Sequence, residues 1–473
     1  MTRLLVIGAD AAGMAAANQA LRVARRRGRS LEVVALEMST HTSYSQCGIP
    51  YWVAGDVADA SSLVARTAEQ HRAAGIDLRL RHEALGLDLA RGECETRDHA
   101  SGRTVTIGFD DVLLATGAAP VVPGWAEGLG PNVHPMKTLD DGSTWRAIVA
   151  GRPRHVLVVG GGYIGVEAAE ALARRGIRTT LLTRREPMAA SLVPEQRARV
   201  RAGLEAIGVT VVGGAEIVGA QRVGAQSVGA QSARAQRGPD HPTPVTLTTT
   251  TGDEHTGDAV VLALGVAPRT RLAAEAGLPV AGDEFPYARR ALVPDARQRL
   301  ADHVWAAGDC CAVADLIVRQ PSYLPLGTHA NKAGRVAGTN LGGGDARFPG
   351  AVGTAITRAG DVEVARTGVH ADWDLGYDPA VTTLDATTAS GYMPQAEPMH
   401  IWAAGDRLSG RLLGVQITGG RGAGKRIDAC AAALMAGLTC EEFAYLDLSY
   451  APPFSPAWDP VQIAVRKLAE SFA

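Results

Sequence analysis

One cysteine stands in a setting that is typical of a reactive thiol. The stretch "SYSQCGIPYWVAGDV" places Cys47 directly before Gly48, Ile49 and Pro50, soon after the first expected strand and helix. A cysteine that only fills a core needs no such neighbours, whereas a redox or nucleophilic thiol often has them. We therefore interpret Cys47 as a candidate nucleophile or redox centre.

The other cysteines have no comparable setting. The chain holds six cysteines in 473 residues, and none shows the C-x-x-C spacing of a zinc site or a redox pair. Adjacent cysteines rarely form a good disulfide, so we interpret Cys310 and Cys311 as packing residues. So few cysteines favour a reducing cytoplasm over a disulfide framework, and no metal site is expected.

A glycine-containing turn follows the first strand-like run, residues 3–8. Gly8 and Gly13 flank this turn, a helical stretch follows, and the run 31–37 ends in Glu37. This order is typical of a dinucleotide-binding βαβ unit, in which the helix N-terminus faces a pyrophosphate. Glu37 is placed to accept hydrogen bonds from a ribose diol. Asp10 replaces the middle glycine of the G-x-G-x-x-G pattern and brings a negative charge near the phosphates unless its side chain points away.

A second turn carries the complete pattern. Its glycines are Gly160, Gly162 and Gly165, between the strand-like run 155–159 and a helical stretch. The next strand ends in Arg184 and Arg185 instead of an acid. Because a guanidinium pairs strongly with phosphate, these arginines favour the 2′-phosphate of NADPH, with NADH still possible.

Further residues near the turns fit a flat cofactor. Tyr163 directly follows the second turn, where its ring can cover a planar group, and Glu167 lies one helical turn further on the same side. Gly308 and Asp309 end another short strand, where an Asp can bind a ribityl hydroxyl.

The elements around these residues indicate a large α/β protein. The length predicts roughly three domains, and 46% of the residues are hydrophobic. A formal net charge of −2 argues against a nucleic-acid partner. No run of 18 apolar residues is present, so no membrane span is expected. A five-residue repeat at 218–237 leads us to interpret 219–244 as a mobile hairpin extension or a disordered loop without a catalytic role.

Taken together, these features resemble the FAD-dependent pyridine nucleotide–disulfide oxidoreductases over nearly the whole length. "ATG" at 115–117 and "AAGD" at 306–309 add to the two turns and the early thiol. Most members pair two cysteines in a Cys-x4-Cys pattern, but Thr42 and Trp52 leave Cys47 without such a partner. The resemblance is therefore to the single-cysteine branch, which includes coenzyme A disulfide reductases, NADH oxidases and peroxidases, and persulfide reductases.

Within this branch the chain looks most like coenzyme A disulfide reductase. "SYSQCGIPY", "GYMP" at 391–394, "GAGKRID" at 422–428 and "YAPPFSPAWDPV" at 450–461 are similar to segments of that family. Gln46 stands where an Asn is usual, and the 219–244 insertion is foreign to the pattern. No His occupies position 10, where oxidases and peroxidases carry one, and no rhodanese-like extension supports persulfide reduction.

The resemblance implies a fold and a domain order. We expect two Rossmann-like dinucleotide-binding domains and a C-terminal α+β dimerisation domain. The FAD domain would comprise 1–115 and 285–345, the NAD(P)H domain 116–284, and the dimerisation domain 346–473. Active sites would be shared across a homodimer.

The resemblance also implies roles for individual residues. Cys47 would begin a helix beside the flavin and form a mixed disulfide with coenzyme A, while Tyr450, with Tyr392, would reach it from the partner subunit and assist the leaving thiol. The expected cofactor contacts are Gly8, Ala11, Ala12, Gly13, Glu37, Thr116, Gly117, Gly160, Gly162, Tyr163, Ile164, Gly165, Glu167, Arg184, Arg185, Gly265, Gly308 and Asp309. The expected coenzyme A contacts are Gln19, Arg22, Ser43, Tyr44, Gln46, Lys425 and Arg426.

The expected function is therefore NADPH-driven reduction of coenzyme A disulfide, or of a related small disulfide, through FAD and Cys47. Three alternatives stay open: an NAD(P)H oxidase that cycles Cys47 through a sulfenate, a polysulfide or persulfide reductase, and a flavin-binding redox sensor. The complete second turn argues against a sensor, because a sensor needs no efficient NADPH site.

Overall fold

The computed structural model describes residues 1–223, 243–369 and 376–472. The chain forms two compact units, each built from helices and sheets. Unit 1 comprises Met1–Gln46, Asp59–Ala119 and Val266–Ala351, and unit 2 comprises Cys47–Ala58, Pro120–Gly265 and Val352–Ala473. The α/β fold class is confirmed, while the division into three domains stays a prediction.

A six-stranded sheet forms the centre of unit 1. Its strand order is β18-β19-β7-β1-β2-β3, and all neighbours are parallel except β18 and β19. Leu4, Leu5 and Val6 of β1 are fully buried, as expected for a parallel strand covered on both faces. The strands are β1 (Thr2–Ile7), β2 (Leu31–Glu37), β3 (Ile76–Leu80), β7 (Asp111–Leu114), β18 (Arg299–Ala301) and β19 (Val304–Ala306).

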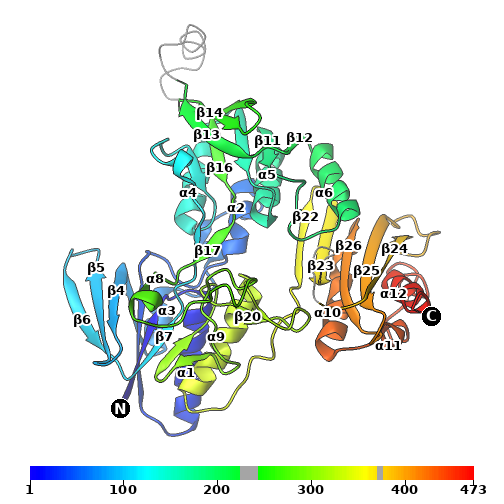
Figure 1. Cartoon of the computed structure of the whole chain (residues 1–473). Coiled ribbons are helices and arrows are strands. Elements are labelled where there is room, and N and C mark those ends of the chain that lie inside the picture. Colours follow the sequence, from blue (N-terminus) through cyan, green and yellow to red (C-terminus); the bar gives the residue numbers. More distant parts are fainter. Residues whose placement is uncertain (224–242, 370–375, 473) are drawn as a thin grey trace. The chain divides into compact units, whose positions relative to one another are not determined.

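Two helices of unit 1 pack closely together, α1 (Ala11–Arg26) and α9 (Gly327–Leu341). Figure 1 shows them side by side. Gly334 and Gly338 make this possible, because a Cβ at either position would lie 2.2 Å from the carbonyl oxygen of Ala12 or Ala16. The close contact fixes α1 and therefore the turn that precedes it.

The remaining elements of unit 1 surround this sheet (Figure 1). An antiparallel sheet contains β4 (His82–Asp88), β5 (Glu93–Asp98) and β6 (Thr104–Gly108). The others are η2 (Ala60–Leu63), α3 (Ala68–Ala73), β8 (Ala118–Pro120), β17 (Val266–Pro268), α8 (Arg271–Glu275), β20 (Val313–Ala314) and β21 (Pro321–Ser322).

Unit 2 contains the second βαβ unit in a five-stranded parallel sheet of order β12-β11-β10-β16-β9. Its strands are β9 (Val133–Pro135), β10 (His155–Val159), β11 (Arg178–Thr183), β12 (Val209–Gly213) and β16 (Ala259–Leu262). The helices with it are α2 (Ile49–Ala54), α4 (Leu139–Ala150), α5 (Tyr163–Arg174) and α6 (Pro194–Ala206), and η1 (Gln46–Gly48) and η3 (Gly124–Ala126) are short 3-10 turns.

The repeat segment begins inside a regular strand. β13 (Ile217–Arg222) pairs antiparallel with β14 (Val245–Thr249), which pairs with β15 (Glu254–Gly257). Residues 219–222 pair with β14 in this hairpin, so the disordered-loop alternative is wrong for these residues. Residues 224–242 lie outside the described residues.

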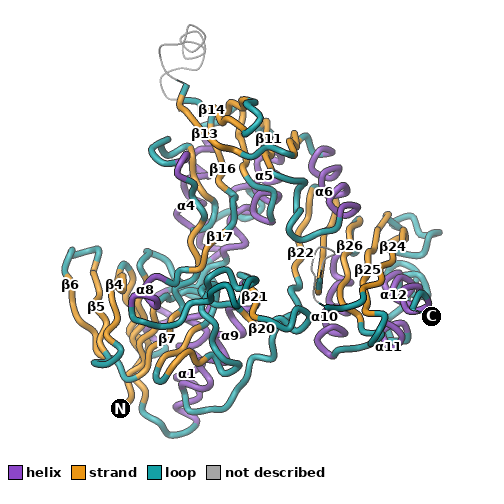
Figure 2. Tube along the Cα trace, in the orientation of Figure 1, coloured by secondary structure: helices purple, strands orange, loops and turns teal. Residues whose placement is uncertain are grey.

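The C-terminal part of unit 2 is an antiparallel sheet with helices packed on it (Figure 2). Its order is β22-β23-β26-β25-β24. The strands are β22 (Ala355–Ala359), β23 (Val362–Gly368), β24 (Pro379–Thr387), β25 (Pro398–Asp406) and β26 (Leu412–Gly419), and the helices are η4 (Gly424–Arg426), α10 (Ile427–Ala436), α11 (Cys440–Ala444) and α12 (Pro460–Glu470). Across the described ranges, every helix is too short or too polar to cross a bilayer.

Candidate functional site

The first turn, between β1 and α1, is tight enough to require its glycines. Gly8 has a φ of +100°, and a Cβ there would lie 2.1 Å from the carbonyl oxygen of Ala115. A Cβ on Gly13 would lie 1.9 Å from the carbonyl oxygen of Gly8. The backbone therefore folds back on the strand and presents the start of α1 at the carboxyl edge of the sheet, where a diphosphate binds in such folds.

The carboxylate of Asp10 points toward the segment that leads into Cys47. Its Oδ1 accepts a hydrogen bond from the backbone N–H of Tyr44 at 3.2 Å, and its Oδ2 accepts one from Nε2 of Gln46 at 2.9 Å. Asp10 makes no side-chain cap to its own helix. The acid that breaks the glycine pattern thus holds residues 44–46, and Gln46 joins directly to Cys47.

Glu37 ends β2 with both carboxylate oxygens engaged by the backbone. Oε2 accepts from the N–H of Ala9 at 3.0 Å, and Oε1 accepts from the N–H of Ser39 at 2.9 Å. Each oxygen keeps a further lone pair. The carboxylate is therefore held rigidly and fits a ribose diol.

Gly308, Asp309 and the 115–117 segment are also placed by contacts within unit 1. A Cβ on Gly308 would lie 2.7 Å from Cβ of Ala12, so this strand end approaches the first turn. The backbone carbonyl of Asp309 accepts from the hydroxyl of Tyr323 at 3.0 Å, and Thr116 Oγ1 donates to the carbonyl of Arg269 at 2.6 Å. The backbone N–H of Arg269 donates to Gly117.

The second turn, between β10 and α5, repeats this backbone with a different middle residue. A Cβ on Gly160 would lie 2.3 Å from the carbonyl oxygen of Ala263, and one on Gly165 would lie 1.8 Å from that of Gly160. A Cβ on Gly162 would meet no protein atom within 4 Å. Because the protein itself does not require Gly162, the space beside the start of α5 fits an approaching diphosphate.

Both predicted phosphate-binding arginines lie exposed after β11. Nη1 of Arg184 is 3.8 Å from Oε1 of Glu216, and the Arg184 side chain is 72% exposed. Such an exposed pair contributes little and exchanges readily for another anion. Arg185 is exposed as well. Their role in choosing NADPH stays a prediction.

Glu167 is the most strongly perturbed acid of α5. Its Oε1 accepts a hydrogen bond from Thr357 Oγ1 at 2.9 Å. The pKa of Glu167 is raised to about 7, chiefly by burial and with a smaller contribution from the charge of Glu170. Tyr163, at the start of the same helix, accepts a hydrogen bond from Nε of Arg366 at 3.4 Å, and Ile164 follows it.

Cys47 differs from every other cysteine in its exposure. It is exposed and lies just before α2, whereas Cys94, Cys310, Cys311, Cys430 and Cys440 are buried free thiols. Cys310 and Cys311 pack in a hydrophobic cluster of unit 1, which confirms their interpretation as core residues. The helix start expected for Cys47 is present.

Tyr51 is a residue that the sequence interpretation missed. It lies on α2, four residues after Cys47. Burial raises the pKa of Tyr51, the charge of Glu167 raises it further, and the charge of Cys47 is among the smaller causes that raise it. The i, i+4 spacing from the thiol was a usable signal.

The coenzyme A candidates on α1 form a small polar cluster. Gln19 is 7% exposed, donates from Nε2 to Thr339 Oγ1 at 2.8 Å and accepts at Oε1 from Arg22 and from Arg335 at 3.4 Å. The Gln19 amide is thus engaged within the protein, and it orients two exposed guanidinium groups. Arg335 was missed because it lies far away in sequence, on α9.

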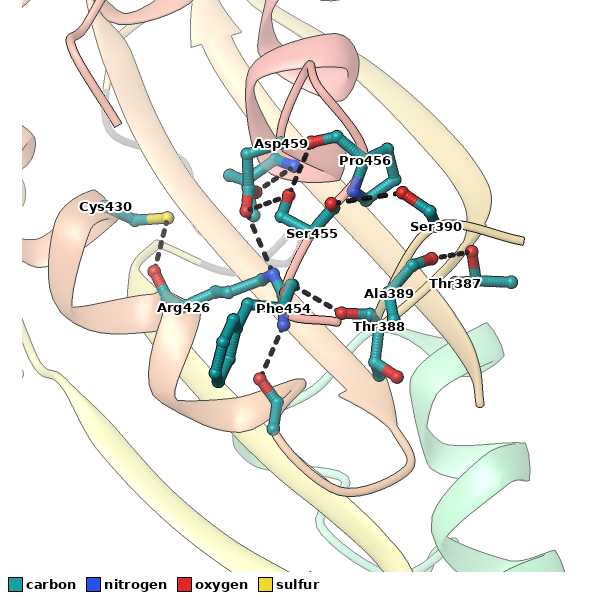
Figure 3. Close-up of polar contacts among 12 residues, drawn as sticks. Thr387, Thr388, Ala389, Ser390, Arg426, Cys430, Phe454, Ser455, Pro456 and Asp459 are labelled. Atoms are coloured by element: carbon teal, nitrogen blue, oxygen red, sulfur yellow. Dashed lines mark hydrogen bonds and ion pairs between the residues drawn. The ribbon is translucent and has the colours of Figure 1, made fainter. Parts of the chain in front are cut away.

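The C-terminal candidates fall into two kinds. Arg426 is the centre of the network in Figure 3: it pairs with Asp459 at 3.1 Å and donates to the carbonyls of Gly422, Thr388 and Phe454. Its guanidinium is therefore engaged within unit 2, and the expected coenzyme A contact stays a prediction. Lys425 is exposed and pairs with Asp428.

The network around Arg426 joins the two segments that carry the tyrosines. Ser390 donates from its backbone N–H to the carbonyl of Pro452 at 3.0 Å. Its Oγ donates to the carbonyl of Ser455 at 3.3 Å (Figure 3). Tyr392 and Tyr450 lie next to these contacts in sequence and are 75% and 51% exposed.

Gly265 is a further position predicted to contact a cofactor, and its φ is +91°. No cluster of metal-ligating side chains occurs in the parts of the chain that the structure describes.

Comparison with known proteins gives consistent matches. The model of the pyridine nucleotide-disulphide oxidoreductase family matches residues 2–334. An NAD(P)H coenzyme A polysulfide/persulfide reductase of Pyrococcus horikoshii is 30% identical and covers 98% of both chains. A coenzyme A disulfide reductase of Staphylococcus epidermidis is 22% identical and covers 98% of this chain and 99% of its own. The structure of reduced Bacillus anthracis CoADR-RHD superposes with a TM-score of 0.88 at 26% identity, covering 100% of this chain and 80% of that chain.

Proposed function

Because the chain belongs to the pyridine nucleotide-disulphide oxidoreductase family, we propose that it reduces coenzyme A disulfide, or a related small disulfide, at Cys47. The family is FAD- and NAD(P)H-dependent, and the protein is an oxidoreductase. The observation that supports Cys47 as the reactive group is its exposure at the start of a helix while the other thiols are buried. A helix start lowers a thiol pKa and favours the thiolate.

The residues present fit both cofactors. We assign FAD to the first turn with Glu37, Gly308 and Asp309, and the nicotinamide nucleotide to the second turn. FAD, when bound, supplies the two-electron acceptor for the hydride of NAD(P)H. The protein supplies binding through the two helix starts and orientation of the thiol through residues 44–46, which Asp10 holds.

The thiol chemistry assigned to Cys47 is a disulfide exchange. Its thiolate attacks one sulfur of the substrate, the S–S bond breaks, and a mixed disulfide forms while the second thiol leaves with a proton. Two electrons from NAD(P)H then release the bound thiol and restore the Cys47 thiolate. Tyr450 and Tyr392 are the proposed proton donors, and their exposure leaves them available to a partner subunit.

We also propose NADPH as the preferred donor, a homodimer with shared sites and a cytoplasmic location. The preference for NADPH is supported by Arg184 and Arg185. The homodimer is supported by the aromatic residues Tyr392, Tyr450 and Phe454, whose exposed fractions of 75%, 51% and 74% are unusual for large apolar side chains. The small number of cysteines, six in 473 residues, fits a reducing compartment.

A second candidate function is reduction of a coenzyme A persulfide or polysulfide. It is favoured by the identity of 30% to the Pyrococcus relative of that name, against 22% for the Staphylococcus reductase. The same exposed thiol serves both reactions, because a thiolate attacks the outer sulfur of a persulfide as it attacks a disulfide.

The deciding experiment is steady-state turnover of the purified flavoprotein with coenzyme A disulfide, coenzyme A persulfide, or oxygen alone. We expect turnover with the first, loss of at least about 1,000-fold in Cys47→Ser, and unchanged flavin reduction by NADPH in that variant. Ser45→Ala, a change at an exposed neighbour, is the matched control. Faster turnover with persulfide would favour the second candidate. Turnover with oxygen alone would identify an oxidase, and no turnover with any acceptor would favour a sensor.

A mixing experiment tests the shared site. Cys47→Ser and Tyr450→Phe chains, each inactive alone, should recover part of the activity after subunit exchange, because one hybrid site keeps both residues. A fully active monomer would contradict the proposal.

A further inference from the structure

Ser43 has a backbone conformation that a serine rarely adopts. Its φ is +49°, in the left-handed region, which persists only where the surroundings enforce it. The carbonyl of Ser43 accepts from the N–H of Ala65 at 2.8 Å, and the N–H of Ser45 donates to the carbonyl of Leu63 at 2.8 Å. These contacts fix where the Ser43 hydroxyl lies.

His71 is a buried imidazole that the proposed reaction does not use. It lies on α3, whose start is fixed by a capping box between Thr67 and Gln70, and it is 2% exposed. Its Nε2 lies 2.8 Å from Ser43 Oγ, and its Nδ1 lies 3.2 Å from Nδ2 of Asn18. A buried imidazole with both nitrogens engaged has a defined tautomer.

The orientation of Asn18 determines that tautomer. Nη1 of Arg66 donates to Oδ1 of Asn18 at 2.8 Å, and Nδ2 of Asn18 donates to the carbonyl of Met14 at 2.8 Å. Both contacts require Oδ1 to face Arg66, so an N–H donor faces Nδ1 of His71. Nδ1 must then be the acceptor, and the ring proton lies on Nε2.

His71 is neutral over the working range of most enzymes. Burial, together with the positive charge of Arg66, lowers its pKa to about 4. The neutral ring donates its single proton from Nε2 to Ser43 Oγ. Ser43 thus accepts this bond and must direct its own hydroxyl proton elsewhere.

Within the described residues, the other hydrogen bond of Ser43 Oγ is to Thr42 Oγ1 at a long 3.5 Å. Thr42 already donates its own proton to the carbonyl of Ala9, so it is at most a weak acceptor for Ser43. The Ser43 proton is therefore available to an acceptor brought by a ligand.

We propose that Arg66, Asn18 and His71 are positioning residues that make Ser43 a hydrogen-bond donor to the disulfide substrate. The acceptor is an amide carbonyl of the arm that carries the substrate's thiol, and the inference rests on the proposed function. A site with an obligate donor binds such an arm and disfavours a substrate without an acceptor, because the hydroxyl would then be left unpaired.

The first test reads the tautomer and needs no turnover. In protein with ¹⁵N-labelled histidine, the His71 signals are identified by their loss in His71→Gln. We expect the shifts of a neutral ring with the proton on Nε2 between pH 5.5 and 8, and a switch of tautomer or titration in Arg66→Ala. A proton on Nδ1, or a charged ring at pH 7, would overturn the inference whatever the enzyme turns over.

The second test is a double-mutant cycle in the disulfide reaction. Ser43→Ala and His71→Phe should each raise KM for coenzyme A disulfide about 5- to 10-fold with little change in kcat, and the double variant should lose no more than Ser43→Ala. His71→Gln, which keeps a donor toward Ser43, should recover most of the loss. Reduction of flavin by NADPH should be unchanged throughout, and His99→Gln, at an exposed histidine of unit 1, is the matched control.

The outcomes distinguish a failure of the positioning role of His71 from a failure of the proposed function. Additive losses in the double variant, or equal losses in the flavin reduction step, would show that His71 only supports folding. A wild-type protein without disulfide turnover would overturn the proposed function and the donor role together, while leaving the measured tautomer as an independent result.

Discussion

The two glycine-rich turns have nearly the same backbone and different neighbours. In both, the flanking glycines are required, because added Cβ atoms would lie 1.8–2.3 Å from backbone oxygens. The middle position holds Asp10 in the first turn and Gly162 in the second. Two residues after the last glycine, α1 carries Ala15 where α5 carries Glu167, and β2 ends in Glu37 where β11 ends in Thr183.

These differences match the proposed assignment of FAD to the first turn and of the nicotinamide nucleotide to the second. The first turn uses its extra side chain to bind residues 44–46 and so connects the cofactor-binding turn with the segment that leads into the thiol. The second turn leaves the space beside Gly162 open and places a titratable acid one helical turn further on. A shared backbone pattern therefore predicts a nucleotide site, while the substituted positions indicate what each site does.

Placing an acid at the middle position of the second turn, as in the first turn, should have the largest effect on activity. Gly162→Asp places a carboxylate in the open space, and like-charge repulsion with the diphosphate should lower kcat/KM for NAD(P)H about 100-fold. Flavin content should stay unchanged. Gly162→Ala is the matched control for added volume, since its φ of −80° suits any residue. Equal losses in both variants would show that space, and not charge, matters at this position.

Replacing Glu167 of α5 with an uncharged residue should remove a pH dependence of the stability of the protein. The folded pKa of Glu167 is raised to about 7 from its ordinary value of 4.5, chiefly by burial. The protonated form is therefore favoured in the folded state, and stability falls as pH rises from about 4.5 through 7. Glu167→Gln should be more stable than wild type by roughly 3 kcal/mol at pH 8 and equal to it at pH 4. Urea unfolding at both pH values measures this difference, and a constant difference at both would contradict it.

Converting the first turn to the second should affect the thiol reaction and leave the cofactor in place. Asp10→Gly removes two hydrogen bonds from residues 44–46, and we expect disulfide reduction to fall about 10-fold. Asp10→Asn keeps one acceptor and should lose less. Rapid-mixing measurements separate flavin reduction, which should be unchanged, from thiol release. Loss of flavin in Asp10→Gly would show that the acid supports the cofactor site itself.

Removing the two arginines that follow β11 should have the smallest effect on activity. Arg184→Ala with Arg185→Ala should lower kcat/KM for NADPH about fivefold, roughly 1 kcal/mol, and leave NADH unaffected, because exposed guanidinium groups contribute little each. Arg178→Ala, an exposed position at the other end of β11, is the matched control. Equal losses with both nucleotides would place the 2′-phosphate elsewhere.

Much of the fold could be predicted because its signals are local. Apolar runs such as 3–8 and 155–159 specify buried parallel strands, and a turn that must contact the preceding strand admits only glycine. The contacts of Arg426 could not be predicted in this way. Its partners Thr388, Phe454 and Asp459 come from distant segments, and a sequence motif cannot tell an arginine that binds a ligand from one that joins loops (Figure 3).

The sequence by itself therefore determined the α/β class, the two glycine-rich turns and the cysteine that we propose as the reactive thiol, since each depends on residues within one strand–turn–helix stretch. Only the tertiary structure decided the direction of the Asp10 carboxylate, the engagement of Gln19 by Arg22 and Arg335, and the tautomer of His71. These depend on hydrogen bonds between residues far apart in sequence. Such bonds form only when packing brings a donor and an acceptor within about 3 Å at a suitable angle.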